Sequence, residues 1–132
     1  MLVSILTREY PPTIYGGAGV HVAQLVPQLR KFIDVDVQCM GEPREGATAH
    51  AENYPEGANA ALRVFGADLS MVAAIPEVDL VHSHTWYANL AGHLTAVIHF
   101  RDDDRLGLLP EGGHFLVRKG PERDQLQNAR PN

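Results

Sequence analysis

Hydrophobic and polar positions along the chain predict three short strands. Residues 2–6 form a short apolar run, and residues 78–82, with Val78, Leu80 and Val81, form another short strand-like segment. Between them, Val35, Val37 and Cys39 alternate with polar residues, which is typical of a strand that buries one face more than the other. Short apolar runs bounded by loop residues favour buried strands, so these segments are expected to form the sheet.

Apolar residues at helical spacing follow each predicted strand. They predict helices over residues 22–33, 57–74 and 87–100, and Pro76 ends the second of them. Pro27 is expected to kink the first helix. Strands that alternate with helices predict right-handed βαβ units, and therefore an α/β fold with a parallel, Rossmann-like sheet. We expect the first strand to lie between the other two, so that the loops after the first and third strands face one cleft.

The pattern changes sharply after Phe100. A cluster of charged residues follows, and then two apolar runs at 106–109 and 114–117 that predict a hairpin. The polar run that ends the chain predicts no regular structure. We therefore expect an ordered domain over residues 1–100 and a divergent, poorly ordered tail over residues 101–132.

Composition and charge narrow the class of protein. The formal net charge of −5 argues against a nucleic-acid partner, because phosphate binding requires a basic face. The single cysteine, Cys39, excludes an intrachain disulfide framework and fits a reducing compartment. No apolar run approaches the roughly 20 residues of a membrane span, and residues 1–8 lack the features of a signal peptide. We expect a cytoplasmic protein with no membrane partner.

The first candidate site is the glycine-rich loop formed by Tyr15, Gly16, Gly17 and Gly19. Glycines let a backbone approach an anion closely, and the following helix offers unpaired N–H groups and the positive end of its dipole. The loop suits a pyrophosphate or a sugar, although a tight turn that needs glycine torsions explains it equally well. It lacks the lysine of a P-loop, and Val22 stands where a dinucleotide fingerprint has its third glycine.

The second candidate site begins where the third strand ends, with His82, His84, Thr85 and Trp86. Ligand sites of open parallel sheets lie at the carboxyl ends of the strands. Imidazoles, hydroxyls and an indole suit a sugar, so we favour a binding role for His84 and Trp86 and a core role for His82. The two histidines share one strand face, but the sequence offers no evident third zinc ligand, and we expect no metal.

These motifs resemble the amino-terminal part of bacterial GT-B glycosyltransferases. The resemblance is carried by residues 7–12, 15–22, 57–62 and 79–89, and it is strongest to the glycogen synthase-like branch of family 4, of the actinobacterial type. It implies two Rossmann-like domains around a cleft, of which residues 1–100 would form an incomplete first domain.

The resemblance also implies a retaining transfer of glucose from ADP-glucose to an α-glucan or to glucose 1-phosphate, with no cofactor. Donor contacts would come from Tyr15, Gly16, Gly17 and Gly19. Acceptor contacts would come from His84, Thr85 and Trp86. The catalytic residues stay unassigned, and Arg8 is the one cation that the sequence places near the two motifs.

Two departures from the family affect the interpretation. Ile14 stands where glycogen synthases have a lysine, which leaves the choice between the two acceptors open. Nothing after Phe100 resembles the family, so we expect a truncated transferase fragment that is inactive alone. The alternative is a non-catalytic α/β module that binds a sugar or a nucleotide. A dinucleotide-dependent oxidoreductase is disfavoured, because the third glycine and the ribose-binding acid are missing.

Overall fold

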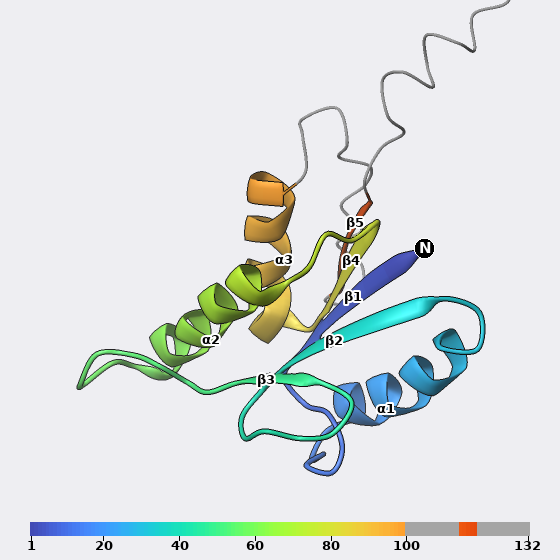
Figure 1. Ribbon diagram of the computed structural model, residues 1–132. Coiled ribbons are helices and arrows are strands. Elements are labelled where there is room, and N and C mark those ends of the chain that lie inside the picture. Colours follow the sequence, from blue (N-terminus) through green and yellow to red (C-terminus); the bar gives the residue numbers. More distant parts are fainter. Residues whose placement is uncertain (100–113, 119–132) are drawn as a thin grey trace, which may run out of the picture.

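A five-stranded sheet with the order β3-β2-β1-β4-β5 organises the protein in the computed structural model, which describes residues 1–99 and 114–118 (Figure 1). Its strands are β1 (Leu2–Thr7), β2 (Asp34–Met40), β3 (Thr48–His50), β4 (Leu80–His84) and β5 (His114–Arg118). The first four run parallel, and β1 lies between β2 and β4. The predicted parallel α/β sheet, with its first strand between the other two, is confirmed.

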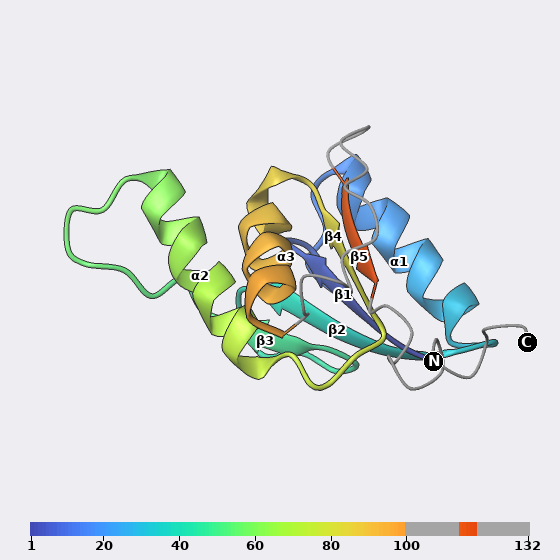
Figure 2. The ribbon, with the colours of Figure 1, turned by 90° about the horizontal axis from the view of Figure 1, so that it is seen from above.

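Three helices cover the two faces of the sheet. They are α1 (Gly17–Leu29), α2 (Ala60–Ala74) and α3 (Trp86–His99). Figure 2 shows α1 on one side of the sheet and both α2 and α3 on the other. Neighbouring residues of β1 point to opposite sides, so Ile5 packs with Val22 of α1 while Leu6 packs with Met71 of α2. Burial on both faces explains why β1 is apolar at every position except Ser4 and Thr7.

The bounds of α2 and α3 lie close to the predicted ones, whereas α1 begins and ends several residues before the predicted range 22–33. α1 starts at Gly17, within the glycine-rich loop, and Pro27 lies inside it. α2 starts at Ala60 because the side chain of Asn59 accepts a hydrogen bond from the backbone N–H of Leu62, at 3.0 Å. Within residues 1–99 and 114–118, no helix is long and apolar enough to cross a membrane.

Two strands differ from the sequence-based expectations. The sequence pattern predicts no strand between residues 41 and 56, but the structure has β3 there, whose three residues are too few to show an alternating pattern. The strand predicted at 114–117 is present as β5, which pairs antiparallel with β4, opposite Val81 and its neighbours. The other arm of the predicted hairpin, at 106–109, lies outside the described residues, as does most of the expected tail over 101–132.

Candidate functional site

The parallel strands end at one edge of the sheet, and both candidate motifs lie there. β1 ends at Thr7 and leads into the glycine-rich loop, while β4 ends at His84 and leads directly into α3. The rings of His21, in the first turns of α1, and His84 lie 5.5 Å apart between their centroids. The prediction that the two motifs meet at the carboxyl ends of the strands is confirmed, and the ligand contacts assigned to their residues stay predictions.

The carboxylate of Glu9 occupies two backbone donors of the glycine-rich loop. Its Oε2 atom accepts hydrogen bonds from the N–H groups of Tyr15 and Gly16, both at 2.8 Å. A Cβ atom at Gly16 would lie 3.1 Å from Glu9 Oε1, and one at Gly19 would lie 2.6 Å from Oε2. These two glycines therefore let Glu9 approach the start of α1, a role that the sequence analysis missed. Glu9 stands shortly before the glycines, but nothing in that spacing distinguishes it from a solvent-exposed acid.

Gly17 differs from the other glycines of the loop. A Cβ atom at this position would meet no heavy atom within 4 Å. Gly17 opens α1, where the N–H groups of the first turn have no partner within the helix. The side chain of Tyr15 is also accessible, with 68% of its surface exposed. Of the four residues expected to contact the donor, Gly17 and Tyr15 are thus accessible from outside the chain.

The histidines of β4 are arranged differently from the expectation. His84 is only 1% exposed, whereas His82 is partly exposed, so the prediction that His82 is the core histidine is wrong. His84 is covered because its ring lies 4.1 Å from the ring of His82 and 5.5 Å from that of His21. His84 is therefore placed to position its neighbours rather than to meet a ligand through an open face.

The turn between β4 and α3 carries a strained residue. Thr85 has a φ of 66°, in the left-handed region that β-branched residues rarely adopt. Its Oγ1 atom is buried and has no hydrogen-bond partner within the described part of the chain. Strain of this kind, at about 1–3 kcal/mol, gathers at functional sites.

Trp86 offers the most accessible aromatic surface of the second motif. Its side chain is 52% exposed, and its ring lies 4.1 Å from the ring of Tyr87. The first turns of α3 are held to β4 because the Ser83 hydroxyl donates a hydrogen bond to Asn89 Oδ1 at 2.7 Å. An exposed indole on a fixed turn suits the apolar face of a sugar ring.

Arg8 lies between the two motifs. The centre of its guanidinium group is 4.1 Å from the centroid of the Tyr87 ring and 5.9 Å from that of Tyr15. Tyr15 belongs to the glycine-rich loop and Tyr87 to α3, so cation–π contacts connect both motifs through one cation. The sequence placed Arg8 near the motifs, and the structure shows that it joins them.

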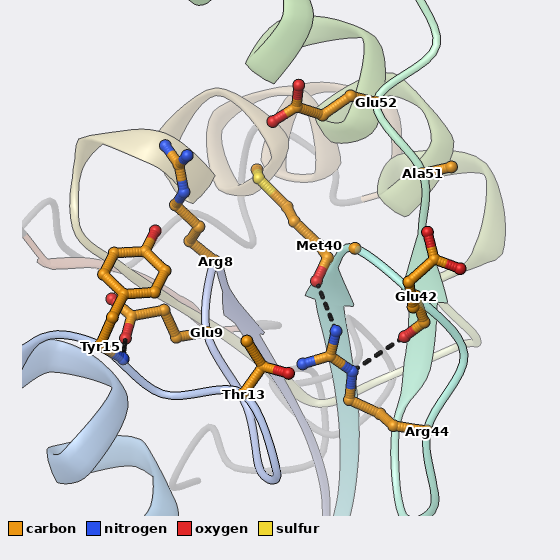
Figure 3. Close-up of a pocket in the computed structure, with 10 residues that line it drawn as sticks. Arg8, Glu9, Thr13, Tyr15, Met40, Glu42, Arg44, Ala51 and Glu52 are labelled. Atoms are coloured by element: carbon orange, nitrogen blue, oxygen red, sulfur yellow. Dashed lines mark hydrogen bonds between the residues drawn. The ribbon is translucent and has the colours of Figure 1, made fainter.

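A pocket of about 480 Å³ opens beside the ends of β1 and β2 (Figure 3). Its charged lining residues include Arg8, Glu42, Arg44 and Glu52, and the ring of Tyr15 forms part of one wall. A cation, carboxylates and an aromatic ring around one cavity suit a sugar that carries a phosphate.

The guanidinium group of Arg44 is held by the backbone. It donates hydrogen bonds to the carbonyl oxygens of Tyr10, Met40 and Glu42, at 2.6, 3.1 and 3.0 Å. These bonds tie the loop after β1 to the end of β2, so Arg44 shapes the pocket wall. Figure 3 shows its side chain turned toward Met40 and Glu42.

Other titratable groups near this edge serve the core. His50 ends β3, and its ring nitrogens lie 2.6 Å from Gln38 Oε1 and 2.7 Å from Ser70 Oγ. Burial lowers the pKa of His50, and the nearby Asp36 offsets part of that change. Burial also raises the pKa of the Cys39 thiol, which argues against a reactive thiolate. No group of three or more His, Cys, Asp or Glu side chains that could hold a metal ion occurs among the residues that the structure describes.

Comparison with known proteins identifies relatives of the chain. A sequence model of glycosyltransferase family 4 matches residues 15–108. An α-maltose-1-phosphate synthase of Mycolicibacterium smegmatis is 58% identical over 100 residues, and those of two strains of Mycobacterium tuberculosis are 56% identical over 100 residues. Each alignment covers 75% of this chain and 26% of the relative. The chain thus spans about a quarter of the length of the curated relatives it matches.

Proposed function

Because this chain belongs to glycosyltransferase family 4, we propose that it provides part of the site of a glucosyltransferase that acts in α-glucan synthesis. The proposed donor is ADP-glucose, and the proposed acceptor is glucose 1-phosphate, with the end of an α-glucan as second choice. One observation carries this proposal, namely the 58% identity to an α-maltose-1-phosphate synthase. The proposed localisation is the cytoplasm, where both sugar phosphates and nucleotide sugars are available.

The reaction divides into binding and transfer. The bond between the glucose anomeric carbon and the diphosphate oxygen breaks, a glycosidic bond forms to an acceptor hydroxyl, and the acceptor proton leaves with the ADP product or with water. Gly17 supports the donor side because its backbone is open at the start of α1, where an anion is favoured. Trp86 supports the acceptor side through its exposed ring.

The transfer step needs more than the described residues supply. A departing diphosphate requires electrostatic stabilisation by preorganised cations and N–H donors. Of the two arginines that line the pocket, Arg44 is bonded to three carbonyls, and two loop N–H groups are bonded to Glu9. We therefore propose that the chain binds substrate portions weakly and does not transfer glucose alone.

A graft tests the proposed function. Residues 1–99 would replace the matching region of the Mycolicibacterium smegmatis relative, and ADP release from ADP-glucose would be measured with glucose 1-phosphate and with glycogen. We expect the graft to form maltose 1-phosphate at a rate within about tenfold of the parent, and to prefer ADP-glucose to UDP-glucose. The same graft with Gly17→Trp should lose transfer, because the indole would fill the open space beside the start of α1.

The graft also separates the two functions under consideration. A folded graft that transfers glucose to neither acceptor, while the parent does, would contradict the transferase proposal. If the 132-residue chain still bound a sugar under those conditions, the non-catalytic binding module would replace it, since the pocket is formed within the described residues.

A further inference from the structure

Arg8 presents a cation to the pocket that no carboxylate of the described chain neutralises. Its guanidinium group lies over the rings of Tyr87 and Tyr15. It also hydrogen-bonds with the side chain of Tyr15. Arg44 is held by three carbonyl groups, and the carboxylate of Glu9 is turned to the glycine-rich loop. Within residues 1–99 and 114–118, Arg8 is therefore the pocket arginine that stays available to an anion.

The opposite wall of the pocket carries negative charge. In Figure 3, Arg8 and Tyr15 lie to one side of Met40, and Glu42 lies to the other side. Glu52 lies above them. Both glutamates are exposed. Carboxylates accept hydrogen bonds from sugar hydroxyls, but they repel a second phosphate. A ligand with one phosphate at one end and hydroxyl groups at the other matches this distribution better than a diphosphate does.

We propose that Arg8 binds the phosphate of the acceptor, glucose 1-phosphate, and so selects a sugar phosphate over an unphosphorylated glucan end. Arg8 is then a specificity-determining residue for the proposed reaction, and this inference rests on the proposed function. The planar guanidinium can form two parallel hydrogen bonds to phosphate oxygens, and the ring of Tyr87 holds its face at 4.1 Å. An arginine held in place loses less freedom on binding than a mobile one.

Binding to the full 132-residue chain tests the role of Arg8 directly. The probes are glucose 1-phosphate, glucose and ADP-glucose. Their binding is measured by titration calorimetry or by NMR chemical shifts. We expect glucose 1-phosphate to bind about tenfold more tightly than glucose, which is the size of one charge-assisted hydrogen-bonded contact. Arg8→Gln should remove this preference, with glucose binding changed by less than about twofold.

Two further variants control for loss of charge and loss of fold. Arg63 also stacks on a tyrosine, at 4.4 Å from the ring of Tyr54, but it lies on α2 and does not line the pocket. Arg63→Gln removes the same charge and should leave the preference intact. Arg8→Lys keeps the charge but loses the planar pair of donors, so it should restore only part of the preference that Arg8→Gln loses. A lysine variant that behaves like the glutamine variant would overturn charge recognition as its basis.

Three results would overturn the assignment. Arg8→Gln could leave the binding of glucose 1-phosphate unchanged, could weaken glucose and glucose 1-phosphate equally, or could weaken ADP-glucose alone. The last result would assign Arg8 to the donor. Because binding is measured without turnover, an inactive graft together with Arg8-dependent binding of glucose 1-phosphate would contradict the proposed function and leave the phosphate site standing. An active graft whose activity with glucose 1-phosphate is unchanged by Arg8→Gln would support the proposed function and contradict the phosphate site.

Discussion

Gly19 lies so close to Glu9 that a Cβ atom at position 19 would come within 2.6 Å of the carboxylate Oε2 and 2.8 Å of the Glu9 Cβ. Glu9 is 8% exposed, and its carboxylate bonds the backbone just before α1. Contact within the chain therefore accounts for the glycine at 19. At Gly17 the same position is open, so internal packing does not account for that glycine.

This difference predicts unequal effects of the same substitution. Gly19→Ala should lower the free energy of unfolding by about 2 kcal/mol, because the new methyl group displaces Glu9. Gly17→Ala should leave it unchanged or raise it by about 0.5–1 kcal/mol, because alanine favours the helix and meets no neighbour. Urea denaturation of both variants measures the difference, and equal losses at the two positions would contradict the role given to Glu9.

Arg44 offers a second test of how the pocket wall is held. Arg44→Lys should cost about 2 kcal/mol of unfolding free energy, because a single ammonium group cannot reach three separate carbonyl groups. Arg63→Lys is the matched control, since Arg63 donates one exposed hydrogen bond, to Ala58 at 3.2 Å, and should cost less than about 0.5 kcal/mol. Thermal or urea unfolding measures the difference in stability. If Arg44→Lys lowers the free energy of unfolding no more than Arg63→Lys does, the three bonds of Arg44 do not hold the pocket wall.

The sequence predicted the core of the fold because its signals are local. Residues 2–6 are apolar apart from Ser4, and residues 78–82 carry Val78, Leu80 and Val81, and short apolar segments of this kind mark buried strands. The order of these strands followed from the general winding of parallel sheets. β3 was missed because three residues carry no periodicity, and the pairing of β5 with β4 was missed because an antiparallel partner distant in sequence leaves no local signal.

The site was predicted in outline, and its internal contacts were not. The loop ends meet as expected, because parallel strands share one carboxyl edge. The burial of His84 depends on how closely His21 approaches it from α1, and the position of Arg8 depends on Tyr87 across the sheet. Both are contacts between segments more than 60 residues apart in the sequence, which spacing along the chain does not encode.

Asp68 predicts a pH dependence of stability. It lies on α2, is fully buried and faces α3 near Ala91, whose backbone offsets only part of the effect of burial. Burial raises the pKa of its carboxyl to about 7 from an ordinary 3.8. The folded state therefore binds more protons than the unfolded state between those two values. Stability from this group is full below a pH of about 4 and is lost as the pH rises to about 7.

Asp68→Asn isolates this contribution. The unfolding free energy of the wild type, relative to the variant, should fall by up to about 4 kcal/mol between pH 4 and pH 8. Asp34→Asn, which removes an exposed carboxylate at the start of β2, should leave the wild-type slope in place. Urea unfolding across this pH range gives both slopes, and an Asp68→Asn variant that keeps the full wild-type slope would show that Asp68 is ionised in the folded state.

The strained turn at Thr85 predicts a stabilising substitution. Thr85→Asn should raise the free energy of unfolding by about 1 kcal/mol, because asparagine tolerates the left-handed conformation and caps helices well. If the strain serves the site, the same change in the graft should lower the rate of transfer while the stability rises. Unfolding curves and initial rates on one preparation distinguish these effects, and a loss of stability would refute the strain.

The last prediction is that the 132-residue chain does not catalyse transfer alone, and it follows from where the charges lie. With Arg44 bonded to carbonyls, Arg8 is the remaining arginine of the described pocket that can meet a phosphate, and the opposite wall carries Glu42 and Glu52. One cation assigned to the acceptor leaves no further free arginine in the described pocket for the departing diphosphate, and electrostatic stabilisation is usually the largest single source of rate enhancement in such reactions.

The pocket is also open to water at the strand edge, so hydrolysis and solvation compete with transfer. We expect no ADP release from ADP-glucose above that of the Gly17→Trp variant, with either glucose 1-phosphate or glycogen as acceptor. Weak binding in the millimolar range, about −4 kcal/mol, should persist because it needs only a few hydrogen bonds. If the chain alone turned over ADP-glucose and Gly17→Trp abolished that turnover, the chain would already hold a competent site. This result would contradict the proposal that transfer requires the remaining part of a family member.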